Sequence, residues 1–465
     1  MLRLHDTATR TVRPLELRDP GQVSMYVCGP TVYDLPHLGH GRYALVFDVI
    51  RRFLLFCGLD VRYVSNVTDV DDNIITRAAA QGRTEAEVAF EFEIRWWEAM
   101  DALGVLRPTV APHATEYVAD MVTLVAELFD RGIAYETADG VYLNVEQVDG
   151  YGLLALQPLE SLRIGARVEA TDEKRSPFDF AVWKKAKPGE PSWDSPWGPG
   201  RPGWHTECVV MALDLLGEGF DLHGGGRDLA FPHHENERAQ AVALEKGFAS
   251  HWTHNGWVEV EGEKMSKSLG NFNSLTDLLE RSDPRAYRLL VLRSHYRSPI
   301  EVTAETVADA EKGLERLDAL ARRFALDDLL ARAPGGFVVL GRDAAQQANG
   351  AAVERFVVVM EDDLDTPGAL AGIFELVTRA HVSADEGRDE EAAALASTVA
   401  VLCAALGLAL RAETGEVDPA SAGLAQARDE ARAGRDFARA DELRDELVAR
   451  GWTVEDGPTG TVIRR

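Results

Sequence analysis

The sequence predicts an α/β fold: a Rossmann-like domain with a doubly wound parallel sheet and an insertion, followed by an α-helical bundle and a small C-terminal α+β domain. A short apolar strand, Met25–Cys28, runs through a Gly/Pro turn into an amphipathic helix that begins near Pro36. A second strand, Phe220–His223, meets three glycines that permit close backbone approach to a ligand. From about Val302 the sequence is rich in Ala and Leu at helical spacing, which predicts the bundle.

The other elements are expected in a regular order along the chain. Further strands are predicted over 61–67, over the run ETADGVYLNV and over 256–260. Helices are predicted over 71–80, 84–103, 116–130, 204–216, 232–246, 302–330, 345–363, 367–382 and 388–411. A polar linker, 412–422, precedes a helix and a hairpin with a Gly-Pro-Thr-Gly turn. The expected domains are therefore 1–132 and 201–301 for the two halves of the α/β domain, 133–200 for the insertion, 302–411 for the bundle and 412–465 for the C-terminal domain.

Composition places the chain among ordinary globular proteins of two to four domains, with 46% hydrophobic and 27% charged residues in 465. No apolar run approaches the roughly 20 residues of a membrane helix, and the N-terminus lacks the apolar segment of a signal peptide. Four cysteines in so long a chain do not suggest a disulfide framework. We therefore expect a cytoplasmic protein without a membrane partner.

The turn and helix start at Pro36–His40 have the properties of a phosphate-binding site. Free N–H groups and the positive end of the helix dipole point at one place. His37 and His40 share one helix face and could donate to a phosphate whose charge grows in a transition state. The alternative is a strand–helix corner with two surface histidines, and the segment alone does not decide between them.

Cysteine, histidine and glutamate on separate segments suggest a metal site. His233 and Glu237 are four residues apart and would face one side of their helix. Cys28 ends the first strand and Cys208 begins the second half, so the topology can bring all four to the strands' carboxyl ends. Thiolates and an imidazole suit Zn²⁺, with a carboxylate as a weaker fourth ligand. The spacing alone is a poor zinc signal, because no CxxC is present.

The net charge of −27 argues against a protein that binds nucleic acid mainly by bulk electrostatics. One basic run could still contact RNA, and the alternative is a solvated helix face. The run comprises Arg281, Arg285, Arg288, Arg293 and Arg297, with Tyr287, His295 and Tyr296 among them.

Two short motifs connect these features to a known family. PHLGHGR begins at Pro36, and KMSKS follows about 220 residues later at Lys264–Ser268. This pair resembles the signatures of class I aminoacyl-tRNA synthetases. Further segments resemble the cysteinyl-tRNA synthetase family from residue 1 to the end of the tail: MYVCGPTVYDLPHLGH, SNVTDVDDNII, RPGWHTEC, DLHGGG, FPHHENE and KMSKSLGN.

The resemblance implies an ATP-dependent cysteine–tRNA ligase that acts as a monomer on L-cysteine, ATP and tRNA(Cys), with one Zn²⁺ per chain and Mg²⁺ accompanying ATP. It implies that Cys28, Cys208, His233 and Glu237 hold the zinc in the amino-acid pocket. It gives His37, His40, Lys264 and Lys267 catalytic roles toward the triphosphate. The residues implied to contact the amino acid or the adenylate are Thr68, Trp204, Gly226, Asp228, Val260 and Lys267. His234 is expected to orient a ligand or contact the nucleotide.

Two other functions share part of this pattern. A zinc-dependent cysteine ligase that hands the adenylate to a small amine, as in mycothiol synthesis, would keep the zinc, phosphate and KMSKS features. The PTVYD segment and the tail after residue 411 favour the synthetase. An inert RNA-binding paralogue should have lost signature residues, yet His37, His40, Lys264 and Lys267 are present. The sequence supplies no obvious protein base for the transfer step.

Overall fold

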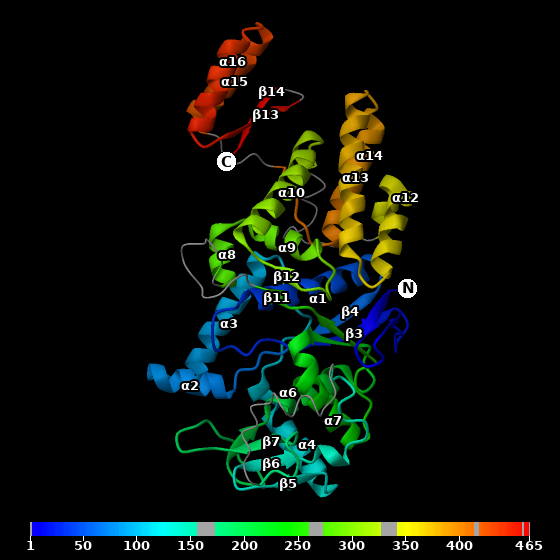
Figure 1. Ribbon diagram of the computed structural model, residues 1–465, viewed down its shortest axis with the longest axis vertical. Coiled ribbons are helices and arrows are strands. Elements are labelled where there is room, and N and C mark those ends of the chain that lie inside the picture. Colours follow the sequence, from blue (N-terminus) through cyan, green and yellow to red (C-terminus); the bar gives the residue numbers. More distant parts are fainter. Residues whose placement is uncertain are drawn as a thin grey trace. The chain divides into compact units, whose positions relative to one another are not determined.

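A computed structural model describes residues 2–155, 173–259, 272, 274–326, 342–412, 418–457 and 460–464 (Figure 1). The chain forms two compact units. The first comprises Met1–Ala310 with Glu354–Leu370, and the second comprises Glu311–Val353 with Ala371–Arg465. No helix within the described ranges is both long and apolar enough to cross a membrane.

The first unit is built on a parallel sheet of four strands in the order β10-β9-β3-β4. The strands are β3 Gln22–Val27, β4 Asp60–Val64, β9 Leu222–Gly226 and β10 His251–Asn255. The chain moves from β3 to β4 on one side and later returns to place β9 on the other side of β3. The direction of winding therefore reverses between β3 and β9, and ligands bind at the carboxyl ends of strands at such a point. This confirms the predicted doubly wound α/β fold.

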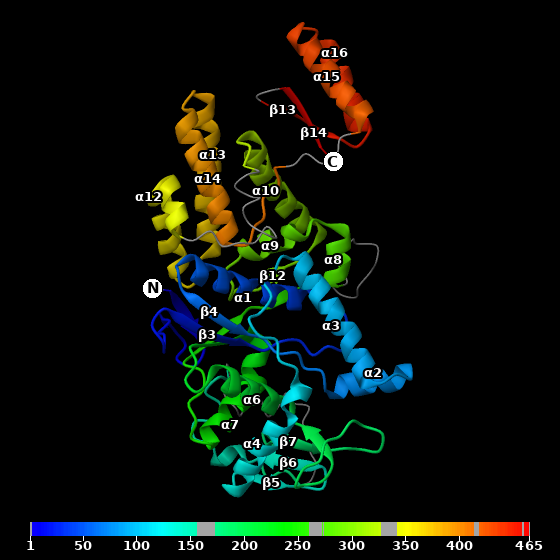
Figure 2. The same cartoon turned by 180° about the vertical axis from the view of Figure 1, so that it is seen from behind.

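Helices cover both faces of this sheet. α1 Leu38–Phe56 lies on one side of β3 and β4, and α6 Trp204–Leu216 with α7 Glu235–Ala243 lies on the other (Figures 1 and 2). α1 is expected from its apolar residues, and its buried positions include Leu45, Val49 and Phe53.

The insertion carries its own antiparallel sheet, in the order β5-β6-β7-β8. Its strands are β5 Ala134–Glu136, β6 Gly140–Leu143, β7 Phe180–Lys185 and β8 Gly200–Pro202. Val141, Leu143 and Trp183 of this sheet share one hydrophobic core with α4 Val118–Asp130 and α6. The insertion therefore packs directly against the helix that carries Cys208.

The remaining elements of the first unit surround this framework. They are the hairpin β1 Arg3–Asp6 and β2 Thr11–Pro14, the helices α2 Asp72–Gln81, α3 Glu85–Ala102, α8 Leu275–Arg281 and α9 Pro284–Leu292, and the strand pair β11 Val258–Glu259 and β12 Ile300–Glu301. α3 begins where predicted, because Thr84 and Glu87 form a reciprocal capping box.

Helices dominate the rest of the chain, as predicted. They are α10 Ala304–Arg323, α12 Arg342–Glu361, α13 Thr366–Asp385 and α14 Asp389–Ala405. The tail contains α15 Pro419–Ala433, α16 Phe437–Ala449 and the hairpin β13 Thr453–Gly457 with β14 Gly460–Arg464. Its small core includes Leu447, Trp452 and Ile463.

Three predictions about elements are wrong in part. A strand was predicted over 256–260, but the strand of the main sheet, β10, ends at Asn255. Only the two-residue strand β11, Val258–Glu259, lies within the predicted range. The helix predicted from Pro232 begins at Glu235, after a π-helical turn over Ala230–His234. The linker predicted over 412–422 already contains the start of α15 at Pro419, where Asp418 caps the helix through Ser421 N.

Candidate active site

A cavity of about 780 Å³ opens where β3, β4 and β9 end. Nine of the residues selected from the sequence line it: Cys28, His37, His40, Thr68, Trp204, Cys208, Gly226, Asp228 and His233. Glu237 is completely buried and is not part of the lining. Val260, Lys264 and Lys267 lie outside the described residues.

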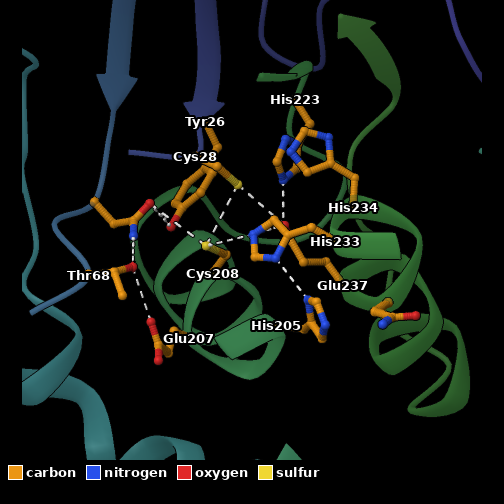
Figure 3. A network of polar contacts seen from close by, with 12 residues as sticks. Tyr26, Cys28, Thr68, His205, Glu207, Cys208, His223, His233, His234 and Glu237 are labelled. Carbon is orange, nitrogen blue, oxygen red and sulfur yellow. Dashed lines mark hydrogen bonds and ion pairs between the residues drawn. The ribbon is translucent and has the colours of Figure 1, made fainter. Parts of the chain in front are cut away.

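Four predicted metal ligands from three separate parts of the chain meet at one wall of this cavity (Figure 3). Cys28 follows β3, Cys208 lies on α6, His233 on the π-helical turn and Glu237 on α7. The two sulfur atoms are 3.7 Å apart, and the Cys28 sulfur lies 3.3 Å from Glu237 Oε1. His233 Nε2 lies 3.7 Å from the Cys208 sulfur and 3.0 Å from Glu237 Oε1.

These separations fit a small tetrahedral metal site. Zinc bonds of about 2.3 Å to sulfur and about 2.0–2.2 Å to nitrogen or oxygen place neighbouring ligand atoms roughly 3.3–3.8 Å apart. All four ligand atoms lie within 4.8 Å of one another, and all four side chains are buried. Two sulfurs, an imidazole and a carboxylate form a donor set suited to Zn²⁺ and poorly suited to the harder cations.

Two histidines that the sequence did not assign to the site, half-buried His205 and buried His223, contact two of the predicted ligands. His205 Nδ1 lies 2.8 Å from His233 Nδ1, which leaves His233 Nε2 facing the sulfurs. His223 Nε2 lies 2.7 Å from Glu237 Oε2, so Glu237 keeps only Oε1 toward the cluster. Partners of this kind fix the orientation of metal ligands. The segments RPGWHTEC and DLHGGG already contained these two histidines, but spacing gave no reason to select them.

Burial shifts the pKa values of the ligands toward their neutral forms. The pKa of the Cys28 thiol is raised well above its ordinary value by burial, and then by Cys208 and Glu237. The hydrogen bond from Cys28 lowers the pKa of Cys208, but burial and nearby Glu237 outweigh it and the net shift is upward. The pKa of His233 is well below its ordinary value because of burial. A metal-free cluster therefore holds two thiols and a neutral imidazole.

His37 and His40 form a reciprocal cap at the start of α1. His37 Nδ1 accepts from His40 N at 3.1 Å, and His40 Nδ1 accepts from His37 N at 3.3 Å. The rings stack with their centroids 3.5 Å apart. Burial lowers the pKa of both histidines, that of His40 to about 3. Each ring is therefore neutral near pH 7, and because Nδ1 accepts a backbone N–H, the proton sits on Nε2.

Asn66 and Glu207 fix the cavity wall around Thr68. Asn66 Nδ2 donates to Thr68 Oγ1 at 3.1 Å, and the Thr68 hydroxyl lies 3.2 Å from Glu207 Oε2. Asn66 Oδ1 also accepts from Gly29 N at 2.9 Å. Trp204 stacks on the His233 ring with the centroids 3.9 Å apart, while 36% of it stays exposed. Thr68 is thus held in one position, and the partly exposed Trp204 covers one face of the predicted ligand His233.

The three glycines of DLHGGG belong to β9 and serve mainly to let other groups pack. A Cβ on Gly224 would lie 2.2 Å from the Phe47 ring of α1, and one on Gly225 would lie 2.9 Å from the His234 ring. Only Gly226 lines the cavity. The expectation that all three glycines approach a ligand is therefore wrong for the first two.

The basic run near 281–297 does not form a free cationic surface. Each arginine is paired with a carboxylate: Arg281–Asp277, Arg285–Asp283, Arg288–Asp48, Arg293–Asp309 and Arg297–Asp363. Arg288, Tyr287 and Tyr296 are also buried. At these three buried residues, both the predicted contact with RNA and the alternative of a solvated helix face are wrong.

Comparison with known proteins adds independent evidence. Residues 14–312 match the family described as tRNA synthetases class I (C) catalytic domain, and residues 355–411 match the DALR domain. The chain is 44% identical to cysteine–tRNA ligase of Syntrophotalea carbinolica, with 99% of this chain and 98% of that protein covered. It is 44% identical to cysteine–tRNA ligase of Chromobacterium violaceum, with both chains fully covered. Among solved structures, it is similar to Mycobacterium tuberculosis methionyl-tRNA synthetase bound to methionyl-adenylate, with a TM-score of 0.59, 16% identity and coverage of 83% of this chain and 90% of that one.

Proposed function

The chain belongs to the cysteine–tRNA ligase family of class I aminoacyl-tRNA synthetases, and from that premise we propose how its residues carry out the reaction. The protein is an ATP-dependent aminoacyl-tRNA ligase that uses an amino acid, ATP and tRNA. The observation that carries the assignment of cysteine to this site is the Cys28, Cys208, His233 and Glu237 cluster. It lies in the wall of the same cavity that His37 and His40 line.

The proposed reaction has two steps. The carboxylate of L-cysteine attacks the α-phosphate of Mg·ATP, which releases pyrophosphate and leaves cysteinyl-adenylate. The ribose 2′-OH of the terminal adenosine of tRNA(Cys) then takes the cysteinyl group and releases AMP. The protein does little covalent chemistry here, so positioning and stabilisation of developing charge account for most of the rate.

His37 and His40 are proposed to hold the phosphates of ATP. Both imidazoles are neutral and carry their proton on Nε2, since each Nδ1 is occupied by a backbone N–H. Each Nε2 can therefore donate to a phosphate oxygen without losing its cap. A neutral donor gains strength as negative charge builds on that oxygen, and the stacked rings act from one side at the positive end of α1.

Lys264 and Lys267 are proposed to close over the departing pyrophosphate, since ammonium groups neutralise the charge that develops on it. Gly226, Asp228 and Val260 are proposed to contact the adenylate. Gly226 and Asp228 line the cavity at the end of β9, next to the residues that follow β3. The placement of the two lysines and Val260 rests on the sequence resemblance alone.

The cluster is proposed to hold one Zn²⁺ and to select cysteine by its sulfur. A bound zinc ion would supply a soft Lewis acid that favours a thiolate over the hydroxyl of serine. Thr68 and Trp204 line the space beside the cluster and are proposed to enclose the rest of the amino acid. An apolar pocket alone discriminates poorly between near-isosteres, so the ligand set provides selectivity that shape cannot.

The protein is proposed to act as a monomer in the cytoplasm, and its remaining domains are proposed to bind the tRNA. The insertion, 133–200, would contact the acceptor stem, and the bundle, 302–411, would contact the body of the tRNA. The tail, 412–465, would contact the anticodon. The tail has its own core around Leu447 and Trp452, which supports its treatment as a separate module.

Metal content and amino-acid preference test the proposal together. Wild-type protein should contain one zinc per chain and catalyse ATP–pyrophosphate exchange with cysteine but not with serine. Cys208→Ser should lose both zinc and cysteine affinity, while ATP binding at His37 and His40 survives. Glu237→Gln should be milder, because a carboxylate is the most replaceable ligand of this set. Tight, cysteine-selective binding after removal of the metal would show that zinc is only structural.

Transfer of the adenylate to a small amine is not favoured, because relatives covered over their whole length, tail included, are named cysteine–tRNA ligases. The acceptor assay separates the two possibilities. Preformed cysteinyl-adenylate should be consumed by tRNA and not by glucosamine-type amines. Consumption by the amine alone would reverse the assignment.

A further inference from the structure

A second cavity, of about 520 Å³, lies in the first unit beside β10. It shares no lining residue with the catalytic cavity. Among the described residues its lining consists of cationic, imidazole and hydroxyl side chains: His5, Thr7, Arg10, Arg227, His254, His295, Arg297 and Ser298. No acidic side chain lines it within the described part of the chain, although the sequence carries a net charge of −27.

The charge in this cavity is only partly neutralised. Arg297 donates through Nε to Asp363 Oδ2 at 2.9 Å. Arg10 donates through Nη2 to the carbonyl of Ala155 at 3.2 Å, and Arg227 lies over the Trp257 ring, 5.4 Å from its centroid. Across the described ranges neither of these two arginines is paired with a carboxylate. Three guanidinium charges against one carboxylate leave a local charge of +2.

Arg10 occupies a backbone conformation that its residue type does not favour. Its φ is 58°, in the left-handed region, at the end of the turn between β1 and β2, where its N–H donates to Asp6 O at 2.7 Å. Glycine or asparagine would adopt this conformation at lower cost, by about 1 kcal/mol. A strained residue that places an unpaired charge at a cavity is a reason to look for a function there.

The floor of the cavity is rigid. His254 is 7% exposed, and both of its ring nitrogens are occupied. Its Nδ1 lies 2.7 Å from Thr7 Oγ1 and its Nε2 lies 2.8 Å from His234 Nδ1. This part of the cavity is therefore ordered before a ligand binds, and its ordering adds nothing to the entropy cost of binding. The pKa of His5 is lowered by burial and then by Arg297, as expected for a histidine near this positive charge.

We propose that this arginine cavity binds a phosphate group. Guanidinium forks match phosphate oxygens in geometry and charge, and hydroxyl groups such as that of Ser298 supply further donors. The inference rests on the proposed function, because that function provides two sources of phosphate: the backbone of tRNA and free pyrophosphate. The tRNA backbone is favoured, since a chain of charge −27 must concentrate positive charge to bind RNA, and Arg281, Arg285, Arg288 and Arg293, which lie outside this cavity, are each paired with a carboxylate.

The test removes the charge of Arg10 by a substitution that its left-handed backbone conformation tolerates. Arg10→Asn suits the left-handed conformation, so its thermal midpoint should equal or exceed that of the wild type. Affinity for tRNA, measured by filter binding at 50–200 mM salt, should fall about five- to tenfold at the lowest salt, and the slope of log Kd against log salt should fall by about 1. Arg10→Lys should keep the slope.

Arg3→Gln is the matched control, because it removes one charge from the same hairpin at a residue outside the cavity lining. It should leave the slope unchanged. If Arg10→Asn weakens binding of inorganic pyrophosphate, measured by calorimetry, and not that of tRNA, the phosphate site stands and its source is the free anion. If neither affinity differs from that of Arg3→Gln, the proposal is overturned. Failure of the proposed function would appear separately, as absent cysteine-dependent exchange in the wild type.

Discussion

Metal binding at the Cys28 and Cys208 cluster should depend steeply on pH. Burial raises the pKa of Cys28 well above its ordinary value, and the net pKa shift of Cys208 is also upward. The metal-free protein therefore carries both as thiols at neutral pH, and both protons must leave when thiolates bind the metal. His233 has a pKa well below its ordinary value and is already neutral, so it releases none.

The sign and the magnitude follow from this count of protons. The metal-free state binds two more protons than the metal-bound state, so metal affinity must rise with pH. Each proton contributes a factor of ten per pH unit, which makes the expected rise about a hundredfold per unit, or about 2.7 kcal/mol. The rise should continue beyond pH 8.5, where it would level off for thiols of ordinary pKa, because these pKa values are raised.

Competition with a chromophoric chelator between pH 6 and 9, without cysteine, measures the slope of log affinity against pH. The expected slope is about 2 for the wild type and about 1 for the much weaker binding that Cys208→Ser retains at high metal concentration, because this variant keeps one thiol. Cys403→Ala removes a buried thiol far along the chain from the cluster and should leave the slope unchanged. A wild-type slope near zero would refute the reasoning, since the sulfurs would then be ionised before the metal arrives, or would not be its ligands.

Four further outcomes are expected. Arg288→Ala should lower the free energy of unfolding in urea by about 3–5 kcal/mol, because it breaks a buried ion pair, whereas the exposed pair lost in Arg281→Ala should cost under about 0.5 kcal/mol. Burial lowers the pKa of His251 to about 4, so the folded protein loses stability as the pH falls from 6.5 toward 4. In the wild type this histidine should lower the free energy of unfolding by about 2 kcal/mol between pH 7.5 and pH 5, and His251→Gln should abolish that part of the decrease. Lys267→Ala should slow pyrophosphate exchange more than tenfold while cysteine affinity, measured by calorimetry, is unchanged. A chain ending at residue 411 should keep exchange but lose most tRNA charging, and unchanged charging would contradict the role given to the tail.

The elements that the sequence predicted well are those whose signals are local. α1 was predicted from a turn and an apolar stripe, and the residues of that stripe are buried, although burial extends around most of the helix and includes Arg42 and Asp48. β10 was misplaced because its residues, HWTHN, show no apolar pattern, although the whole strand is buried. One of its two histidines, His254, is accommodated by contacts with groups distant in the sequence, such as Thr7.

The roles of charged residues were harder to predict than those of apolar residues, because the role of a charged residue depends on its ion-pair partner, which the sequence does not reveal. Arg288 looked like part of an RNA-binding run, yet its partner Asp48 lies 240 residues earlier in the chain. Residue type and the topology of the sheet predicted the cluster of Cys28, Cys208, His233 and Glu237, whose ligand atoms lie within 4.8 Å of one another. The histidines that orient them, His205 and His223, could not be selected, because only the folded chain shows which imidazole faces which ligand.

The positions of the four proposed ligands in the chain would link the proposed selection of the amino acid to folding. Cys28 precedes the insertion, whereas Cys208, His233 and Glu237 follow it, and only His233 and Glu237 are neighbours on one turn. An unfolded chain cannot present these groups together, so a metal bound at the proposed site would add its binding free energy to the stability of the first unit. A ligand substitution would therefore both weaken selection of the thiol and loosen the junction between β3 and α6. Such a substitution would act on both thiol selection and stability. The cysteine affinity of each variant must therefore be compared with its free energy of unfolding before a loss of affinity is attributed to the missing ligand.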